Sequence, residues 1–224
     1  MNPRGMSWFS NIVLGFDTSQ RDWGSDFTFN AFWGEVKFSF PRDDEGLFFR
    51  AFGKKIGDSD KAPIQDLIFL DGANPREQFK KYYLRSHGSI PEEAHYHLPG
   101  GGNLRGYYNQ PIIGDQVLAL NVELRKKFDP PFYRRKLRKI LGTLSMVVFS
   151  DIASMEFLNS EHEFFADAGL GLRFENFLPD QWYTIFTGGR WTTFRLDFPI
   201  WVNKPLPDES ELRFRWVFGF EQAF

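Results

Sequence analysis

The sequence predicts an all-β protein whose antiparallel strands form a transmembrane β-barrel. Aromatic residues make up 18% of the 224 residues and include 27 phenylalanines, an abundance typical of the lipid-facing band and girdles of a membrane barrel. Several segments alternate apolar and polar residues over more than the about 5–6 residues of an ordinary globular strand. No apolar run approaches the ~18 residues of a spanning helix, and the mean hydropathy of -0.39 excludes a helical membrane protein.

The first quarter of the chain contains three predicted strands. They cover about residues 8–16, 27–40 and 47–55, separated by a polar loop at 17–26 and a tight turn at 41–46. In the second strand the apolar residues change parity, from Phe29 and Trp33 to Val36 and Phe38. A bulge inserts one extra residue and shifts the parity of everything after it, so we predict a β-bulge at Gly34.

A long irregular region follows at about 57–114, with a short helix predicted near 75–84. A connection of this length in a compact domain is usually functional. It contains a glycine run that permits close backbone approach, followed by an arginine and an aromatic residue. We expect this loop to fold into the barrel and dock its arginine on a carboxylate. The loop residues that we select are Gly101, Gly102, Arg105, Gly106 and Tyr107.

The rest of the chain reads as further strands at about 115–127, 140–151, 164–175, 182–202 and 212–220. In 115–127, Leu118, Leu120 and Leu124 share one face, and Asn121 and Glu123 share the other, which indicates a strand with one apolar face. The total is about eight strands, most of them near or above the ~9–11 residues that cross a bilayer when tilted. We expect a single domain over 1–224 with one long extracellular loop.

A series of short motifs occurs in a fixed order along the chain. They are Gly101–Tyr107, Asn121–Arg125, Val147–Ala153, Ala168–Arg173, Arg195–Pro199 and a final strand ending at Phe224. Together they resemble the BamA-type superfamily of outer-membrane assembly barrels and two-partner secretion translocators, over roughly 48–224. The first motif is similar to the family's Arg-Gly-aromatic loop motif. The third is similar to its Phe-x-Asp-x-Gly motif, with Ala153 where glycine is usual.

The resemblance implies a function and a set of roles. The protein would insert or translocate proteins, or lipids, across the outer membrane of a Gram-negative bacterium, gated by the Arg-Gly-Tyr loop. By motif order, Asp151 is the first carboxylate partner of Arg105 and Glu123 the second, with Asp167 as an alternative. The turns at 41–46, 128–139 and 176–181 would face the periplasm, as would Phe224, which would serve as the assembly signal.

The strand count constrains the partners. The family implies sixteen strands, usually preceded by periplasmic domains, so this chain would supply the C-terminal half. An eight-stranded barrel has room only for its own side chains, and open sheet edges cannot face lipid. The expected partners are therefore a missing N-terminal half of the barrel or a second copy of the chain, together with outer-membrane lipids and client polypeptides. A small closed barrel with the loop above its mouth ranks last.

Other function classes find little support. The chain has no Gly-x-Ser-x-Gly elbow, and the glycine run lacks the Lys-Ser/Thr of a phosphate-binding loop, so we predict no enzyme and no cofactor. His95 and His97 are spaced as two metal ligands on one strand face, with His87 nearby, but the sequence fixes no third ligand. We therefore predict no metal site. The net charge of -2 argues against nucleic-acid binding.

Three further expectations complete the set. The chain contains no cysteine, which fits a periplasmic or outer-membrane location. Its start shows no signal peptide, so an exported protein would be seen here without its signal or as a fragment. The basic residues at 125–127 and 134–139 are expected in a periplasmic turn that binds anionic lipid headgroups, binds a periplasmic partner, or is simply solvated. An anchoring barrel for a missing effector domain and a soluble aromatic-rich β protein remain the alternative functions.

Overall fold

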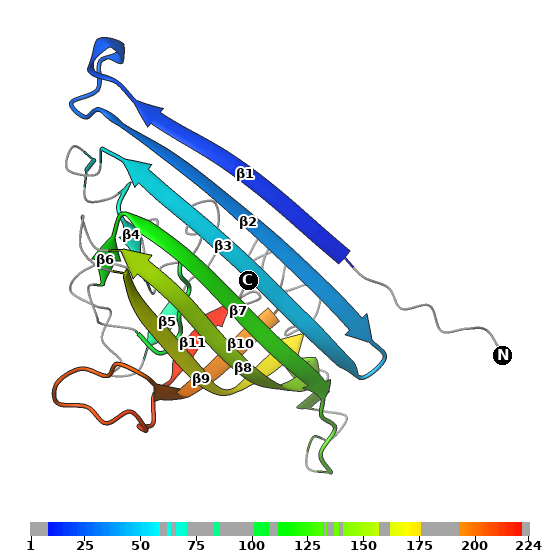
Figure 1. Ribbon diagram of the computed structural model, residues 1–224. Coiled ribbons are helices and arrows are strands. Elements are labelled where there is room, and N and C mark those ends of the chain that lie inside the picture. The colour runs from blue at the N-terminus through cyan, green and yellow to red at the C-terminus, as the bar shows by residue number, and fades with distance from the viewer. Residues whose placement is uncertain are drawn as a thin grey trace.

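The computed structural model describes residues 9–58, 62–63, 66–70, 83–85, 101–107, 112–131, 133, 137–138, 141–156, 162–175 and 193–220. They form an all-β structure dominated by one curled antiparallel sheet, in which β9, β10 and β11 turn back behind β7 and β8 (Figure 1). Within the described residues this sheet has nine strands, and the first eight, in spatial order, are β1 (Phe9–Ser19), β2 (Phe29–Arg42), β3 (Glu45–Gly57), β7 (Gln116–Lys127), β8 (Thr143–Glu156), β9 (His162–Glu175), β10 (Thr193–Val202) and β11 (Val217–Phe220).

Shorter elements complete the described structure. The three-residue β5 (Tyr83–Arg85) pairs with β11. A separate two-stranded sheet pairs β4 (Ile68–Phe69) with β6 (Ile113–Gly114). A 3-10 helix, η1 (Arg21–Trp23), lies between β1 and β2. In the described part of the chain no helix is long and apolar enough to cross a membrane.

The sheet is open within the described residues. β1 stands at one end of the strand order and β5, beside β11, at the other. The prediction of an all-β fold with about eight antiparallel strands is confirmed, but in the part of the chain that the structure describes the sheet does not close on itself into a barrel. An open end leaves a row of backbone donors and acceptors available for another strand.

The predicted β-bulge at Gly34 is wrong. β2 pairs with β1 on one side and β3 on the other in continuous register through this residue. The apolar residues change parity because the environment inside the curled sheet changes: Trp33 and Glu35 both face inward, and Glu35 accepts a hydrogen bond from the buried Arg50. A register shift occurs instead between Pro199 and Trp201, where β10 pairs with β9.

Two other expectations differ from the structure. Residues 83–85, at the end of the predicted helix, form a strand, and the rest of that helix lies outside the described residues. The final strand begins at Val217 rather than at residue 212. Before it, Arg213 donates its backbone N–H to the carbonyl of Ile200 at 3.0 Å, so the chain already runs beside β10. The first half of the predicted strand 182–202 also lies outside the described residues.

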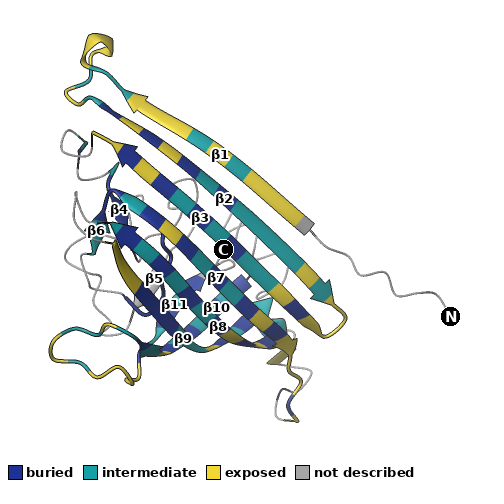
Figure 2. Ribbon diagram, in the orientation of Figure 1, coloured by how far each residue is buried: buried dark blue, intermediate teal, exposed yellow. Residues whose placement is uncertain are grey.

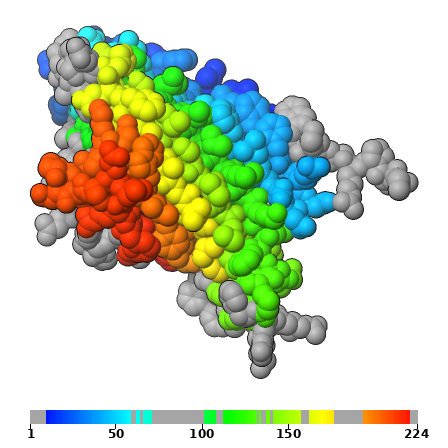
Figure 3. All heavy atoms as spheres, turned by 60° about the horizontal axis from the view of Figure 1, so that its bottom comes forward, coloured from blue at the N-terminus to red at the C-terminus, as the bar shows by residue number. Residues whose placement is uncertain are grey.

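The outer, convex face of the sheet is apolar and exposed. Every second residue of the strands points outward, and Figure 2 shows the resulting alternation of buried and exposed positions. Figure 3 shows the strands side by side as an uninterrupted surface. The exposed large apolar residues on this face include Ile12, Leu14, Phe16, Phe32, Leu118, Leu124, Met146, Val148, Phe164 and Leu170. In water this pattern would be unfavourable, because contiguous apolar patches are normally covered.

The inner face divides into two halves. The half nearer the ends of β3 at Gly57 and β7 at Gln116 is apolar and packs against β4. Its buried residues include Phe29, Trp33, Phe52, Ile56, Ile68, Val117, Met155 and Phe165. The other half is charged and equally buried. Its residues include Glu35, Arg50, Asn121, Glu123, Arg125, Asp151, Arg173, Arg195 and Asp197.

Candidate functional site

The loop at residues 101–107 lies against the inner face, on the border between the apolar and charged halves. Leu104 is fully buried in the apolar cluster, and its backbone N–H donates to the carbonyl of Leu70 at 3.2 Å. Gly102 has no room for a side chain, because a Cβ there would lie 2.2 Å from the Leu70 carbonyl oxygen. Gly101 has a φ of +143° and packs on the ring of Phe52. The glycines therefore allow the loop backbone to pack directly on its neighbours.

Arg105 extends from this loop into the charged half. Its Nε and Nη2 donate to the two carboxylate oxygens of Asp151 at 2.7 and 2.8 Å, and its Nη1 donates to Glu123 at 2.5 Å. The guanidinium also stacks over the ring of Phe149, 3.6 Å from the centroid. The Arg105 side chain is 2% exposed, and both carboxylates are fully buried. A bidentate, charge-assisted pair fixes orientation as well as position.

Glu123 is the centre of the charged half. One of its oxygens accepts from Arg105 and from Arg173 at 2.6 Å, and the other accepts from the Nε of Arg125 at 2.8 Å. Arg173 continues the network to Asp197 at 2.6 Å. Positive and negative groups thus alternate across β7, β9 and β10. Such networks are stable only when every member is paired, because each isolated charge would be costly to bury.

A second group of contacts holds the loop backbone. Arg50 donates to the Gly101 carbonyl at 2.9 Å and to the side-chain oxygen of Asn121 at 2.7 Å. The Asn121 amide nitrogen donates to Asp151 at 3.0 Å and, at longer range, to the carbonyls of Gly102 and Asn103. Buried carbonyls need such partners, so these two side chains replace the backbone pairing that an irregular segment lacks.

The end of the loop is fastened to β9. The Gly106 N–H donates to Asp167 at 2.8 Å, and the Tyr107 hydroxyl donates to the Ala166 carbonyl at 3.0 Å. The Tyr107 hydroxyl also bonds Asn203, and its ring packs edge-on against Phe165 with centroids 5.4 Å apart. Burial raises the pKa of Tyr107 to about 12. The hydroxyl is therefore protonated and able to donate at neutral pH.

The structure brings together most of the residues that the sequence singled out. Asp151 and Glu123 both contact the Arg105 guanidinium. Asp167 receives the backbone of Gly106 instead of the arginine side chain. Phe224 lies outside the described residues, as do His87, His95 and His97. Among the described residues, no group of three or more His, Asp or Glu side chains is arranged to hold a metal ion.

One assignment from the sequence is wrong, and several residues were missed. Arg125 was grouped with the basic turn, but it lies on the inner face, stacks over Phe48 and pairs with Glu123. Residue 125 has the same parity as 121 and 123 in β7, and the alternation of the sequence had already placed Arg125 on their face. Arg50 and Arg173 were missed because the sequence around an inward-facing arginine does not indicate whether its side chain contacts the loop or the loop's carboxylate partners.

No protein-family model matches this chain, and a search of curated proteins found no match for it. The site is therefore interpreted from its geometry: a network of buried ion pairs that positions a loop on the inner face of an open sheet.

Proposed function

We propose that the chain is half of a wide outer-membrane β-barrel of the BamA type, which inserts or translocates polypeptides under the control of the docked Arg105 loop. The observation that carries the proposal is the inverted distribution of polarity. Leu118 and Leu124 on the outer face are 67% and 54% exposed, whereas Glu123 and Asp151 on the inner face are fully buried. A soluble sandwich would have the reverse arrangement. A membrane barrel has an apolar exterior and a polar interior.

The height of the apolar band supports a membrane location. On the outer face of β7 the apolar residues lie between Gln116 and Lys126. These two polar residues, which border the apolar residues Leu118 to Leu124, are ten residue steps apart. At about 3.4 Å per step their separation is roughly 34 Å along the strand, or about 26 Å along the normal at a tilt of about 40°, so the apolar residues fit within the ~25 Å band of outer-membrane barrels.

Polar pairs border the band at both ends. At one end Thr18 donates to Asn30 at 2.7 Å, and Glu156 lies 3.5 Å from His162. At the other end Glu45 pairs with Lys126 at 2.8 Å. Such borders fit the headgroup regions on the two sides of a bilayer.

The open sheet and the docked loop together support a wide barrel. Eight strands closed on themselves would leave room only for their own side chains. Here the inner face also accommodates β4, β6 and residues 101–107. Additional strands, from a preceding part of the polypeptide or from a second copy, would cover the edge of β1 and enclose the loop. The loop would then occupy the lumen and control passage through it.

The test is Arg105→Ala in the full chain reconstituted in lipid vesicles. Removing the guanidinium leaves the buried Asp151 without its arginine and takes from Glu123 one of its three arginines; breaking a buried ion pair in this way usually costs about 3–5 kcal/mol. We expect loop cleavage by chymotrypsin, which cuts beside Leu104 and Tyr107, to rise by on the order of a hundredfold as the open population grows. Insertion of an unfolded outer-membrane barrel client should change in parallel, while the chain itself stays heat-modifiable.

Arg213→Ala is the matched control, since Arg213 pairs with Glu209 at 2.5 Å but is 40% exposed. It should change neither readout. Unaltered loop cleavage in Arg105→Ala would contradict the gating role. A heat-modifiable wild-type chain without any client insertion would favour an anchoring barrel, and a chain that stays monodisperse without detergent would contradict the membrane location.

A further inference from the structure

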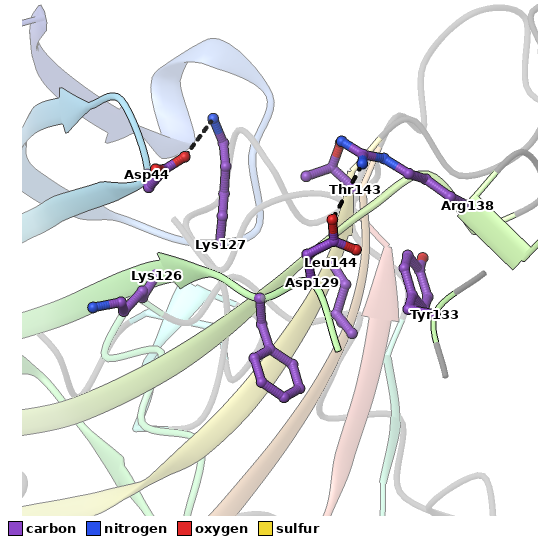
Figure 4. Close-up of a pocket in the computed structure, with 9 residues that line it drawn as sticks. Asp44, Lys126, Lys127, Asp129, Tyr133, Arg138, Thr143 and Leu144 are labelled. Atoms are coloured by element: carbon purple, nitrogen blue, oxygen red, sulfur yellow. Dashed lines mark hydrogen bonds and ion pairs between the residues drawn. The ribbon is translucent and has the colours of Figure 1, made fainter. Parts of the chain in front are cut away.

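A pocket of about 280 Å³ lies at the end of the sheet where β2 turns into β3 and β7 leads toward β8. Its lining includes Asp44 in the β2–β3 turn, Lys127 at the end of β7, and Leu144 at the start of β8. Figure 4 shows these side chains around a common space, with Tyr133 and Arg138 from the β7–β8 connection on the far side. The pocket is remote from Arg105 and takes no part in the proposed gating.

The rim of the pocket carries three exposed cations. Lys126, Lys127 and Arg138 have side chains that are 70%, 50% and 57% exposed. Each faces one carboxylate, at 2.8 Å for Glu45, 3.9 Å for Asp44 and 3.5 Å for Asp129. Exposed pairs of this kind are weak and are easily exchanged, so a better anion can take their place.

The connection that contributes to this rim is the most basic stretch of the chain. Residues 126–139 contain seven Lys and Arg and one acidic residue, whereas the whole protein has a net charge of -2. A local excess of this size attracts anions beyond the carboxylates already nearby. Residues 134–136 and 139 lie outside the described residues, and only their charge is counted in this excess.

The rim also lies at the border of the apolar band. Lys126 continues the outward parity of Leu120 and Leu124 along β7. Phe128 and Leu137, which are next in sequence to Lys127 and Arg138, are 41% and 42% exposed. Cations next to exposed aromatic and aliphatic groups, immediately beyond a lipid-facing stripe, match the level of phospholipid headgroups.

We propose that this pocket binds the headgroup of an anionic phospholipid, with the phosphate at Lys126, Lys127 and Arg138 and the acyl chains along Leu124 and Met146. The inference rests on the proposed membrane location, which supplies the lipid. A bilayer lipid fits better than a free anion, because the apolar outer surface begins at Leu124, the next outward-facing residue of β7 before Lys126. The site would fix the depth and tilt of this end of the sheet in the membrane.

The experiment titrates phosphatidylglycerol into the detergent-solubilised full chain and counts bound lipids by native mass spectrometry. Phosphatidylcholine is the neutral comparison, and inorganic phosphate is the competitor. The variant is K126Q/K127Q/R138Q. The matched control is K55Q/K204Q/R213Q, which removes three exposed cations at the opposite end of the sheet.

We expect the apparent affinity for phosphatidylglycerol to fall by on the order of tenfold or more in K126Q/K127Q/R138Q, since each cation near a headgroup contributes appreciably. The control and the binding of phosphatidylcholine should not change. Equal loss in both triple variants, no loss in either, or full displacement by equimolar inorganic phosphate would each overturn the proposal. Heat-modifiability is measured on the same samples, so a failure of the membrane proposal is recognised separately.

Discussion

Both halves of the inner face are buried, but one is filled by apolar side chains and the other by charged ones. In the apolar half, Trp33 stacks on Phe52 and Leu104 inserts among aliphatic neighbours, so stability comes from burial alone and tolerates local repacking. In the charged half, Glu123 and Asp151 are as deeply buried, but each depends on particular arginines. The loop joins both halves through adjacent residues, Leu104 and Arg105. Apolar packing can hold the loop close, whereas the ion pairs determine its position and conformation.

The largest expected loss of stability comes from disrupting the ion-pair network in the charged half. Glu123→Ala leaves Arg105, Arg125 and Arg173 without their shared partner, and losing one member of a buried pair costs about 3–5 kcal/mol. We expect the urea midpoint of the folded protein in detergent micelles to fall accordingly. Glu163→Ala, which removes an exposed partner of Lys204, is the control and should leave the midpoint unchanged. A midpoint as high in Glu123→Ala as in the control would show that the network contributes little.

A smaller effect is expected at the border between the halves. In Gly106→Ala the new Cβ would lie 2.5 Å from Val202 Cγ1 and 2.8 Å from Asp167 Cβ, and overpacking of this kind costs about 1–3 kcal/mol. The loop should become more accessible to chymotrypsin while the sheet stays folded. Gly53→Ala is the matched control, because its nearest neighbour would be 3.8 Å away on the outer face. Equal protease resistance in both variants would contradict close packing at Gly106.

The smallest effect concerns pH. Because burial raises the pKa of Tyr107 to about 12, above the ordinary tyrosine value of 10.0, the folded state binds the phenolic proton more tightly than the unfolded state does. The contribution of this group is therefore complete below pH 10 and is lost as the pH rises toward 12. Cleavage of the loop should increase across this window, and Tyr107→Phe should abolish that increase. If cleavage of the wild-type loop did not change from pH 9 to 12, the Tyr107 hydroxyl would not be needed to hold the loop on β9.

Much of the sheet was predictable from the sequence, because alternation is a local property. In β7 the opposite faces of Leu124 and Glu123 are evident from parity alone, and the same holds for β9. β2 was misread at Gly34 because apolar side chains face inward at Trp33 and outward at Val36 without any change of register. The sequence reports where apolar residues occur, but not that the inner face itself turns from apolar to charged partway along the strand.

The site was only partly predictable for a related reason. The glycine run followed by a lone arginine was sufficient to select Arg105, whereas Asp151 and Glu123 were selected by motif order, through the resemblance to the BamA-type superfamily. The contributions of Arg50 and Asn121 depend on cross-strand register, since residues 71 positions apart meet only when β3 pairs with β7. The open ends of the sheet in the described residues likewise depend on which distant strands pair and have no local signature.

The free edge of β1 has a consequence for the order of assembly. Within the described residues β1 has hydrogen-bonded neighbours only on its β2 side. Water can satisfy the opposite edge, but in hydrocarbon each unsatisfied group costs several kcal/mol. If the sheet spans a membrane as proposed, the edge must acquire its neighbouring strand before, or while, the sheet leaves water. If that strand belongs to the same polypeptide, the process is first order; if it belongs to a second molecule, the rate rises with protein concentration. The kinetic order of membrane entry would thus reveal which molecule completes the sheet.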